Sequence, residues 1–77
     1  MKADETLDTR GLLCPIPVIR TQDRVKQLTP GTVLDVFATD PGALHDIPAW
    51  CRIHGHRLIE THDDGQDIRI QIEVGAP

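Results

Sequence analysis

The sequence predicts a two-layer α/β sandwich in which two helices cover one face of a four-stranded mixed sheet. Three observations support this fold class. Apolar residues recur at helical spacing over residues 15–28. Residues 32–39 are β-branched and mostly apolar, as in a central strand. Residues 56–62 and 67–74 are strand-like segments on either side of a hairpin turn, so the expected element order is β-α-β-α-β-β.

The first strand and the first helix lie in the N-terminal part of the chain. Residues 5–9 form a short strand candidate, and Gly11 begins a turn. Over residues 15–28 the apolar positions that repeat at helical spacing are Val18, Val25 and Leu28. Residues 29–31 read Thr-Pro-Gly, which ends a helix because proline cannot continue it and glycine turns the chain.

The second helix is bounded by a proline. Pro48 would be costly in a helix interior, so we expect the regular helix to begin near Asp46, after a turn at 40–42 and a short lead-in. Asp46 would then be the N-cap residue. One face of this helix is apolar and carries Ile47, Trp50, Cys51 and His54. Gly55 ends the helix as a C-cap.

The two C-terminal strands flank residues 63–66, whose sequence Asp-Asp-Gly-Gln is typical of a hairpin. Within 67–74, apolar and polar residues alternate, which predicts a strand with one buried face. The first two strands flank a helix, so we expect them to be parallel with a right-handed crossover. The last two strands should be antiparallel, as in any hairpin.

Length and composition limit the possible functions. The chain has 77 residues, which we expect to form one domain, 1–77, whose thin core leaves no room for a large cofactor. A net charge of −4 and only two aromatic residues, Phe37 and Trp50, argue against direct nucleic-acid binding. The longest nearly apolar run, 12–19, is too short for a membrane span. Two cysteines and a charged N-terminus without a secretory signal predict a cytoplasmic protein.

Residues 11–17, Gly-Leu-Leu-Cys-Pro-Ile-Pro, form the segment with the clearest chemical potential. We place Cys14 at the N-cap of the first helix, with Pro15 and Pro17 at the first and third helical positions, where a missing N–H costs nothing. A thiolate at the positive end of a helix is stabilised, so the pKa of Cys14 should be lowered and its sulfur should be a nucleophile. The alternative is a small, buried and inert helix-start residue.

This segment resembles the Cys-Pro-X-Pro signature of the TusA/SirA-like sulfur-carrier family. The resemblance covers nearly the whole chain and includes 7–8, 29–31, 40–41 and 46–51. It implies a two-layer α/β sandwich and a persulfide formed on Cys14. It also implies a sulfur-donor protein of the desulfurase or rhodanese type, and an acceptor protein that takes the sulfur on a cysteine. Members of this family serve tRNA thiolation, sulfur oxidation or cofactor synthesis.

Further residues are candidates for supporting roles around Cys14. Asp40 follows the second strand as Cys14 follows the first, so both should lie at the carboxyl edge of the sheet. There Asp40 would donate a proton or bind a basic group, or it is simply a turn residue before proline. Four basic residues form either an exposed helix face or a docking surface for an acidic partner or the sulfur donor: Arg10, Arg20, Arg24 and Lys26.

Cys51 lies on the apolar helix face, so we interpret it as a packing residue, with a second sulfur site or a resolving thiol as the alternative. We expect no metal site, because Cys51, His54 and His56 lack the paired ligand spacing of a structural zinc site. The rival hypothesis for the whole chain is a non-catalytic regulatory or protein-interaction module. A redox pair of Cys14 with Cys51 is a weaker option, since nothing in the sequence places them together.

Overall fold

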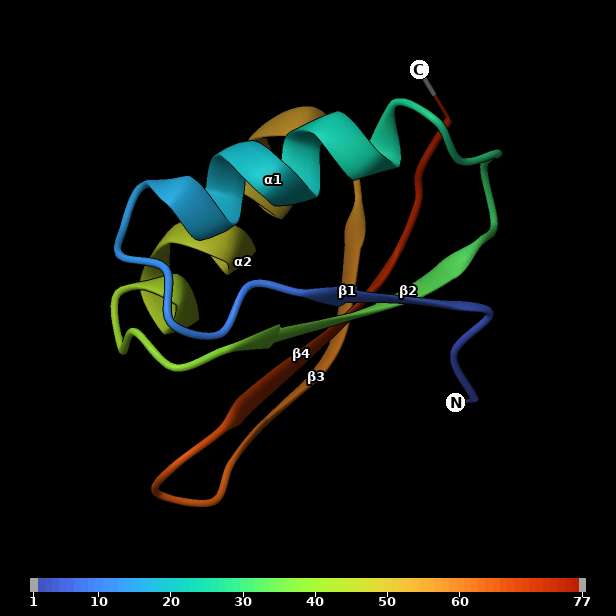
Figure 1. Ribbon diagram of the computed structural model, residues 1–77. Helices are drawn as coiled ribbons and strands as arrows, with labels where there is room; N and C mark the ends of the chain where they lie inside the picture. Colours follow the sequence, from blue (N-terminus) through green and yellow to red (C-terminus); the bar gives the residue numbers. More distant parts are fainter. Residues whose placement is uncertain (1, 77) are drawn as a thin grey trace.

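The structure is a computed structural model that describes residues 2–76, and it has the predicted element order (Figure 1). The strands and helices are, in chain order, β1 Glu5–Asp8, α1 Ile16–Val25, β2 Val33–Ala38, α2 Ala43–His54, β3 Arg57–Asp63 and β4 Ile68–Glu73. Each predicted strand is present, with ends that differ from the prediction by about one residue.

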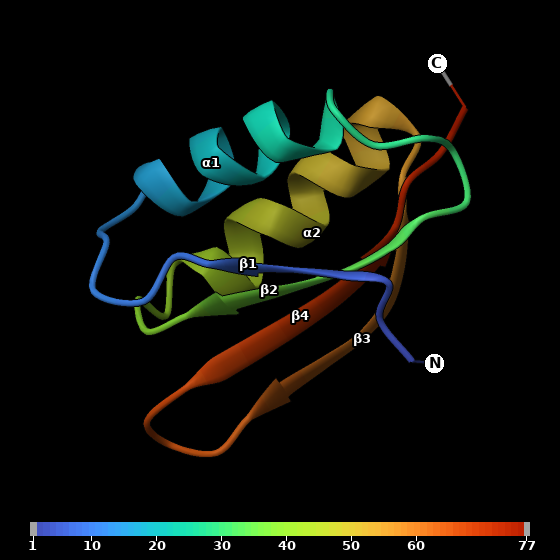
Figure 2. The same ribbon diagram turned by 45° about the vertical axis from the view of Figure 1, so that its right-hand side comes forward.

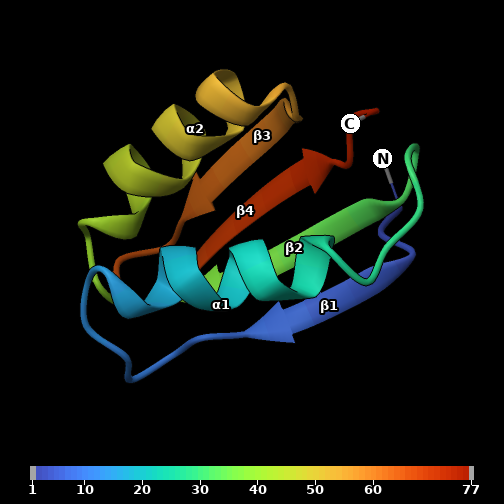
Figure 3. The same cartoon turned by 90° about the horizontal axis from the view of Figure 1, so that it is seen from above.

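The four strands form one mixed sheet in the order β1-β2-β4-β3. β1 pairs with β2 in parallel, and β4 pairs antiparallel with both β2 and β3. Both helices lie on the same face of this sheet, as the view from above shows (Figure 3). The two-layer α/β sandwich predicted from the sequence is therefore confirmed.

The core lies between the helices and the sheet. The side chains that are completely buried there include Leu34 and Val36 of β2, Ile47 of α2, and Ile70 and Ile72 of β4. This agrees with the apolar alternation in β4, since residues two apart in a strand share a face.

The opposite face of β4 differs from the expectation of one buried and one exposed face. Gln71 points away from the helices and is nevertheless 1% exposed. Its Nε2 donates a hydrogen bond to Asp35 Oδ1 at 3.0 Å, and Arg69 forms ion pairs with Asp35 and Glu60 on neighbouring strands. Gln71 therefore lies on an inner strand beside a polar network that joins β2, β4 and β3.

Helix α1 is shorter than predicted at both ends. Its N-cap is Pro15 rather than Cys14, so Cys14 lies outside the helix and Pro17 takes the second helical position. The reason is a separate turn before the helix, in which the Ile16 N–H donates to the Leu13 carbonyl at 2.9 Å. After Val25 the chain continues in tight turns to residue 28 instead of a regular helix.

Helix α2 begins four residues earlier than predicted. Its N-cap is Gly42, so the N-cap role expected for Asp46 is wrong: Asp46 lies inside the first turn, and Pro48 lies inside the helix. The turn that begins at Asp40 leads directly into helical hydrogen bonding, and burial of Ala43 and Ile47 offsets the cost of the proline. Gly55 ends the helix with φ 79°, as the C-cap prediction requires.

The connections that precede the two helices meet at one end of the molecule. Figures 1 and 2 both show the β1–α1 loop and the β2–α2 loop side by side, at the end away from the chain termini. This arrangement follows from the parallel pairing of β1 and β2, whose carboxyl ends lie at the same edge of the sheet.

Candidate functional site

Cys14 is exposed at this edge, and Asp40 holds its backbone in place. The Cys14 N–H donates to Asp40 Oδ2 at 2.6 Å, while the Gly42 N–H donates to Asp40 Oδ1 at 3.0 Å. These bonds lower the pKa of Asp40, since both stabilise its charged form. The structure thus brings Cys14 and Asp40 together, as the strand order predicted, and Asp40 ties the two loops to each other.

A second carboxylate contacts the sulfur itself. The Cys14 thiol donates a hydrogen bond to Asp46 Oδ2, from the first turn of α2. Sequence reasoning missed this residue because it treated Asp46 as a cap. The available signal was positional: a helix that follows the second parallel strand begins at the same edge as Cys14.

The electrostatic setting of Cys14 is the reverse of the one predicted. The hydrogen bond to Asp46 raises the pKa of Cys14, and desolvation and the negative charges of Asp46 and Asp40 raise it further. The expected lowering assumed that Cys14 was the N-cap of α1, but the helix begins beyond Pro15. Two nearby carboxylates, rather than a helix N-terminus, therefore set the electrostatic environment of the sulfur and favour its thiol form.

Gly42 makes room for Cys14. A Cβ atom on Gly42 would lie 3.3 Å from the Cys14 Cβ and 3.6 Å from its Sγ. The first of these distances is shorter than the 3.5–4.0 Å that two carbon atoms prefer. A glycine at the start of α2 therefore allows the two loops to approach each other at the sulfur.

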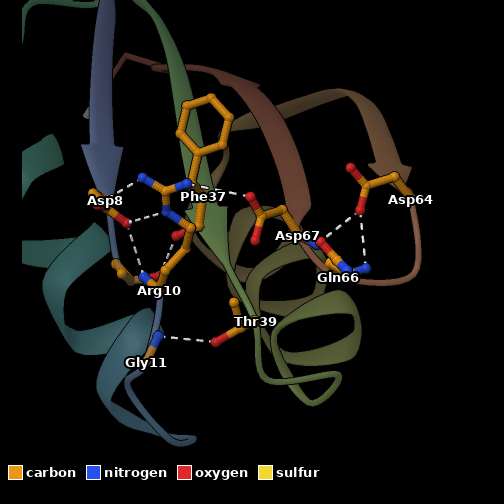
Figure 4. Close-up of polar contacts among 9 residues, drawn as sticks. Asp8, Arg10, Gly11, Phe37, Thr39, Asp64, Gln66 and Asp67 are labelled. Atoms are coloured by element: carbon orange, nitrogen blue, oxygen red, sulfur yellow. Dashed lines mark hydrogen bonds and ion pairs between the residues drawn. The ribbon is translucent and has the colours of Figure 1, made fainter.

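Three of the four basic residues predicted as a docking surface make contacts with other parts of the fold: Arg10, Arg24 and Lys26. Arg10 forms ion pairs with Asp8 at 2.9 Å and Asp67 at 3.2 Å, and its guanidinium lies over the Phe37 ring (Figure 4). Asp8 and Phe37 belong to β1 and β2, and Asp67 lies in the connection between β3 and β4.

Arg24 lies near the other end of α1, where it pairs with Glu5 at 3.1 Å. Lys26 lines a pocket of about 430 Å³ at that same end, together with Trp50 and Val74. Arg20 is exposed on α1. A docking role for these basic side chains stays a prediction.

Apolar side chains adjoin Cys14 in the chain instead. Leu13 is 74% exposed and Ile16 is 38% exposed, and Ile19 follows one turn later on α1 at 47%. Large exposed apolar side chains that cluster in this way indicate a surface for another molecule.

Cys51 is buried, as its apolar helix face predicted. It is 1% exposed, and burial raises its pKa to about 11. Neither cysteine is in a disulfide. The Trp50 ring next to Cys51 stacks on His56 with 4.7 Å between ring centroids. Across residues 2–76, no three histidine, cysteine or acidic side chains are grouped to hold a metal ion.

Among the same described residues, neither helix has the length and apolar content that a bilayer crossing requires.

Comparison with known proteins identifies the family. The sequence profile described as sulfurtransferase TusA matches residues 5–74. The chain belongs to the TusA family of sulfur carriers. It is 44% identical to the sulfur carrier protein TusA of Pseudomonas aeruginosa PAO1 over 61 residues. These aligned residues cover 79% of this chain and 77% of that protein. It is 43% identical to YrkI of Bacillus subtilis over 75 residues, or 97% of this chain and all of YrkI.

A solved structure of a TusA relative shows the same fold. The SirA-like protein of Desulfitobacterium hafniense superposes with a TM-score of 0.80 at 27% identity, covering 94% of this chain and 99% of that one. The TusA/SirA-like resemblance proposed from the sequence is therefore confirmed.

Proposed function

We propose that the Cys14 sulfur carries a transferable sulfur atom as a persulfide and passes it to a cysteine of a partner protein. The observation that supports this most directly is the contrast between the two thiols. Cys14 is exposed at the carboxyl edge of the parallel strands, whereas Cys51 is buried in the core. Membership of the TusA family makes sulfur carriage the relevant chemistry, and Cys14 is the thiol that a partner can reach.

Uptake is a thiol–disulfide type of exchange. The Cys14 sulfur attacks the outer sulfur of the donor's cysteine persulfide, a new S–S bond forms at Cys14, and the donor's S–S bond breaks. The donor cysteine leaves as a thiolate and takes up the proton that Cys14 loses. The transferred sulfur keeps its oxidation state, so no further oxidant or reductant is needed.

Delivery repeats this exchange in the other direction. The acceptor's thiolate attacks the outer sulfur of the Cys14 persulfide, and Cys14 leaves as a thiolate that is then protonated. The donor would be a protein of the desulfurase or rhodanese type. The acceptor would belong to a sulfur relay that serves tRNA thiolation, sulfur oxidation or cofactor synthesis.

Mass spectrometry after incubation with sodium tetrasulfide tests the assignment to Cys14. The wild type should gain about 32 Da for each sulfur, on a peptide that contains Cys14. Cys14→Ser should not gain this mass and should stay folded, because the side chain is exposed and little packing is lost. Cys51→Ala is the matched control and should load as the wild type does. Loading that persists in Cys14→Ser would overturn the assignment of the transferable sulfur to Cys14.

A further inference from the structure

Two carboxylates contact Cys14, and exposed apolar side chains flank it in the chain. Asp46 contacts the Cys14 thiol and Asp40 binds the Cys14 backbone. The ion pairs found within residues 2–76 involve neither of these two carboxylates. Leu13 and Ile16 flank Cys14 in the chain, and both are exposed. We call this surface the sulfur rim and define it as Leu13, Cys14, Ile16, Asp40 and Asp46.

Such a rim suits one kind of partner chemistry. A partner surface with carboxylates would meet like charges at Asp40 and Asp46, which costs binding free energy. Within the described chain, the Asp46 carboxylate accepts its side-chain hydrogen bond from the Cys14 thiol. A cationic side chain of a partner would therefore find this carboxylate without a competing ion pair from the described residues. The exposed apolar side chains would supply the contact area that excludes water around this charge pair and strengthens it.

We propose that the sulfur rim docks partner segments that carry a lysine or arginine beside their cysteine, and that this cation, by pairing with Asp46, releases the Cys14 sulfur from its thiol form. The proposal deepens the function proposed above, since the partner's cysteine is the one that exchanges sulfur with Cys14. When Asp46 pairs with the cation, its negative charge no longer opposes ionisation of the thiol. The proton that leaves Cys14 goes to the departing donor thiolate.

The charge preference of the rim can be measured with small thiol reagents. Trimethylammonium-ethyl methanethiosulfonate is cationic and sulfonatoethyl methanethiosulfonate is anionic, and both form a mixed disulfide with a thiolate and release methanesulfinate. On the wild type at low salt, the cationic reagent should modify Cys14 faster than the anionic one, on the order of tenfold relative to the same ratio for free cysteine. Raising the ionic strength from about 0.01 M to about 1 M should largely abolish the preference, since the screening length falls from roughly 30 Å to roughly 3 Å.

Asp46→Asn tests the residue. This variant should lose most of the charge preference, and its Cys14 pKa, followed by thiolate absorbance, should fall towards the ordinary value of 9.0. Asp23→Asn is the matched control, because it removes the same charge from an exposed position two turns into α1. It should leave both measurements unchanged.

Two results would overturn the proposal: a wild type that reacts equally fast with both reagents or faster with the anionic one, or an Asp46→Asn variant with the wild-type Cys14 pKa. Fluorescence of Trp50 checks that the variants are folded. If Asp46→Asn does not fold, the salt dependence of the wild-type preference still decides, because it needs no substitution. None of these readouts requires sulfur loading, so a failure of Cys14 to accept sulfur and a failure of the rim to favour cations are separate results.

Discussion

The buried Cys51 thiol should make the free energy of unfolding decrease as the pH rises above about 9. Burial raises its pKa from 9.0 to about 11 in the folded protein. Below pH 9 the thiol is neutral in both states and adds no pH dependence. Above it the unfolded chain ionises first, so the unfolded state is favoured and stability is lost as the pH rises through the folded pKa of Cys51.

The size of this loss follows from the difference of about two between 9.0 and about 11. Each pKa unit corresponds to about 1.4 kcal/mol, so the upper limit is about 3 kcal/mol. Relaxation and water entry at high pH reduce this, and we expect a loss of about 2 kcal/mol. A domain of 77 residues has a total stability of roughly 4–12 kcal/mol, so the effect is large enough to measure.

Urea unfolding followed by Trp50 fluorescence measures this loss in the free energy of unfolding, because Trp50 is the chain's single tryptophan and is 8% exposed. The comparison is made in a Cys14→Ser background, which removes the second thiol from the titration. At about pH 8, adding Cys51→Ala should cost on the order of 1 kcal/mol through lost packing. At about pH 11 the variant with Cys51 should have lost that advantage. Parallel pH curves for the two proteins would refute the reasoning.

Two further predictions concern backbone contacts. Gly75→Ala should lower the free energy of unfolding by roughly 1–3 kcal/mol in urea titrations, because a Cβ there would lie 2.0 Å from the Gly55 carbonyl oxygen and the two backbones would have to separate. In a pH titration followed by NMR, the amide protons of Cys14 and Gly42 should shift together with a midpoint below 3.8 as Asp40 is protonated. Neither shift should occur in Asp40→Asn, and two different midpoints in the wild type would contradict the shared carboxylate.

The fold could be predicted because its signals are local in the sequence. The hairpin turn at 63–66, the alternation in β4 and the β-branched β2 each specify an element without knowledge of the others. Chain order and the handedness of the first crossover then leave few topologies. Burial of Gln71 was not predictable in this way, because it depends on side chains of neighbouring strands.

The candidate site was predictable only in part. Cys14 and Asp40 follow adjacent parallel strands, so strand order alone brings them together. Asp46 was misplaced because a local rule, the cost of Pro48 inside a helix, was given more weight than the turn that begins at Asp40. Tertiary burial of α2 overrides that local cost, and the contact of Asp46 with the sulfur depends on where the helix begins.

Two basic residues that are close to Cys14 in sequence, Arg10 and Arg24, form their ion pairs with other parts of the fold. Helix α1 has 10 residues and is therefore about 15 Å long, so Arg24 lies near the end opposite to Cys14. Arg10 is only four positions before Cys14, but its guanidinium pairs with Asp8 at the end of β1 and with Asp67 in the connection between β3 and β4. Spacing along the chain could not distinguish these positions.

A raised pKa at Cys14 suits a carrier that must wait between partners. A thiol reacts slowly with stray electrophiles, yet the thiolate of a more basic thiol is the stronger nucleophile once it forms. The same property has a cost at delivery, because a more basic thiolate is the poorer leaving group. If Asp46 sets this basicity, a cation at Asp46 has to be present in both steps: it frees the sulfur for attack on the donor persulfide, and it stabilises Cys14 as it departs. On the proposal made for the sulfur rim, the donor and the acceptor should therefore share one feature, a basic side chain next to the reacting cysteine.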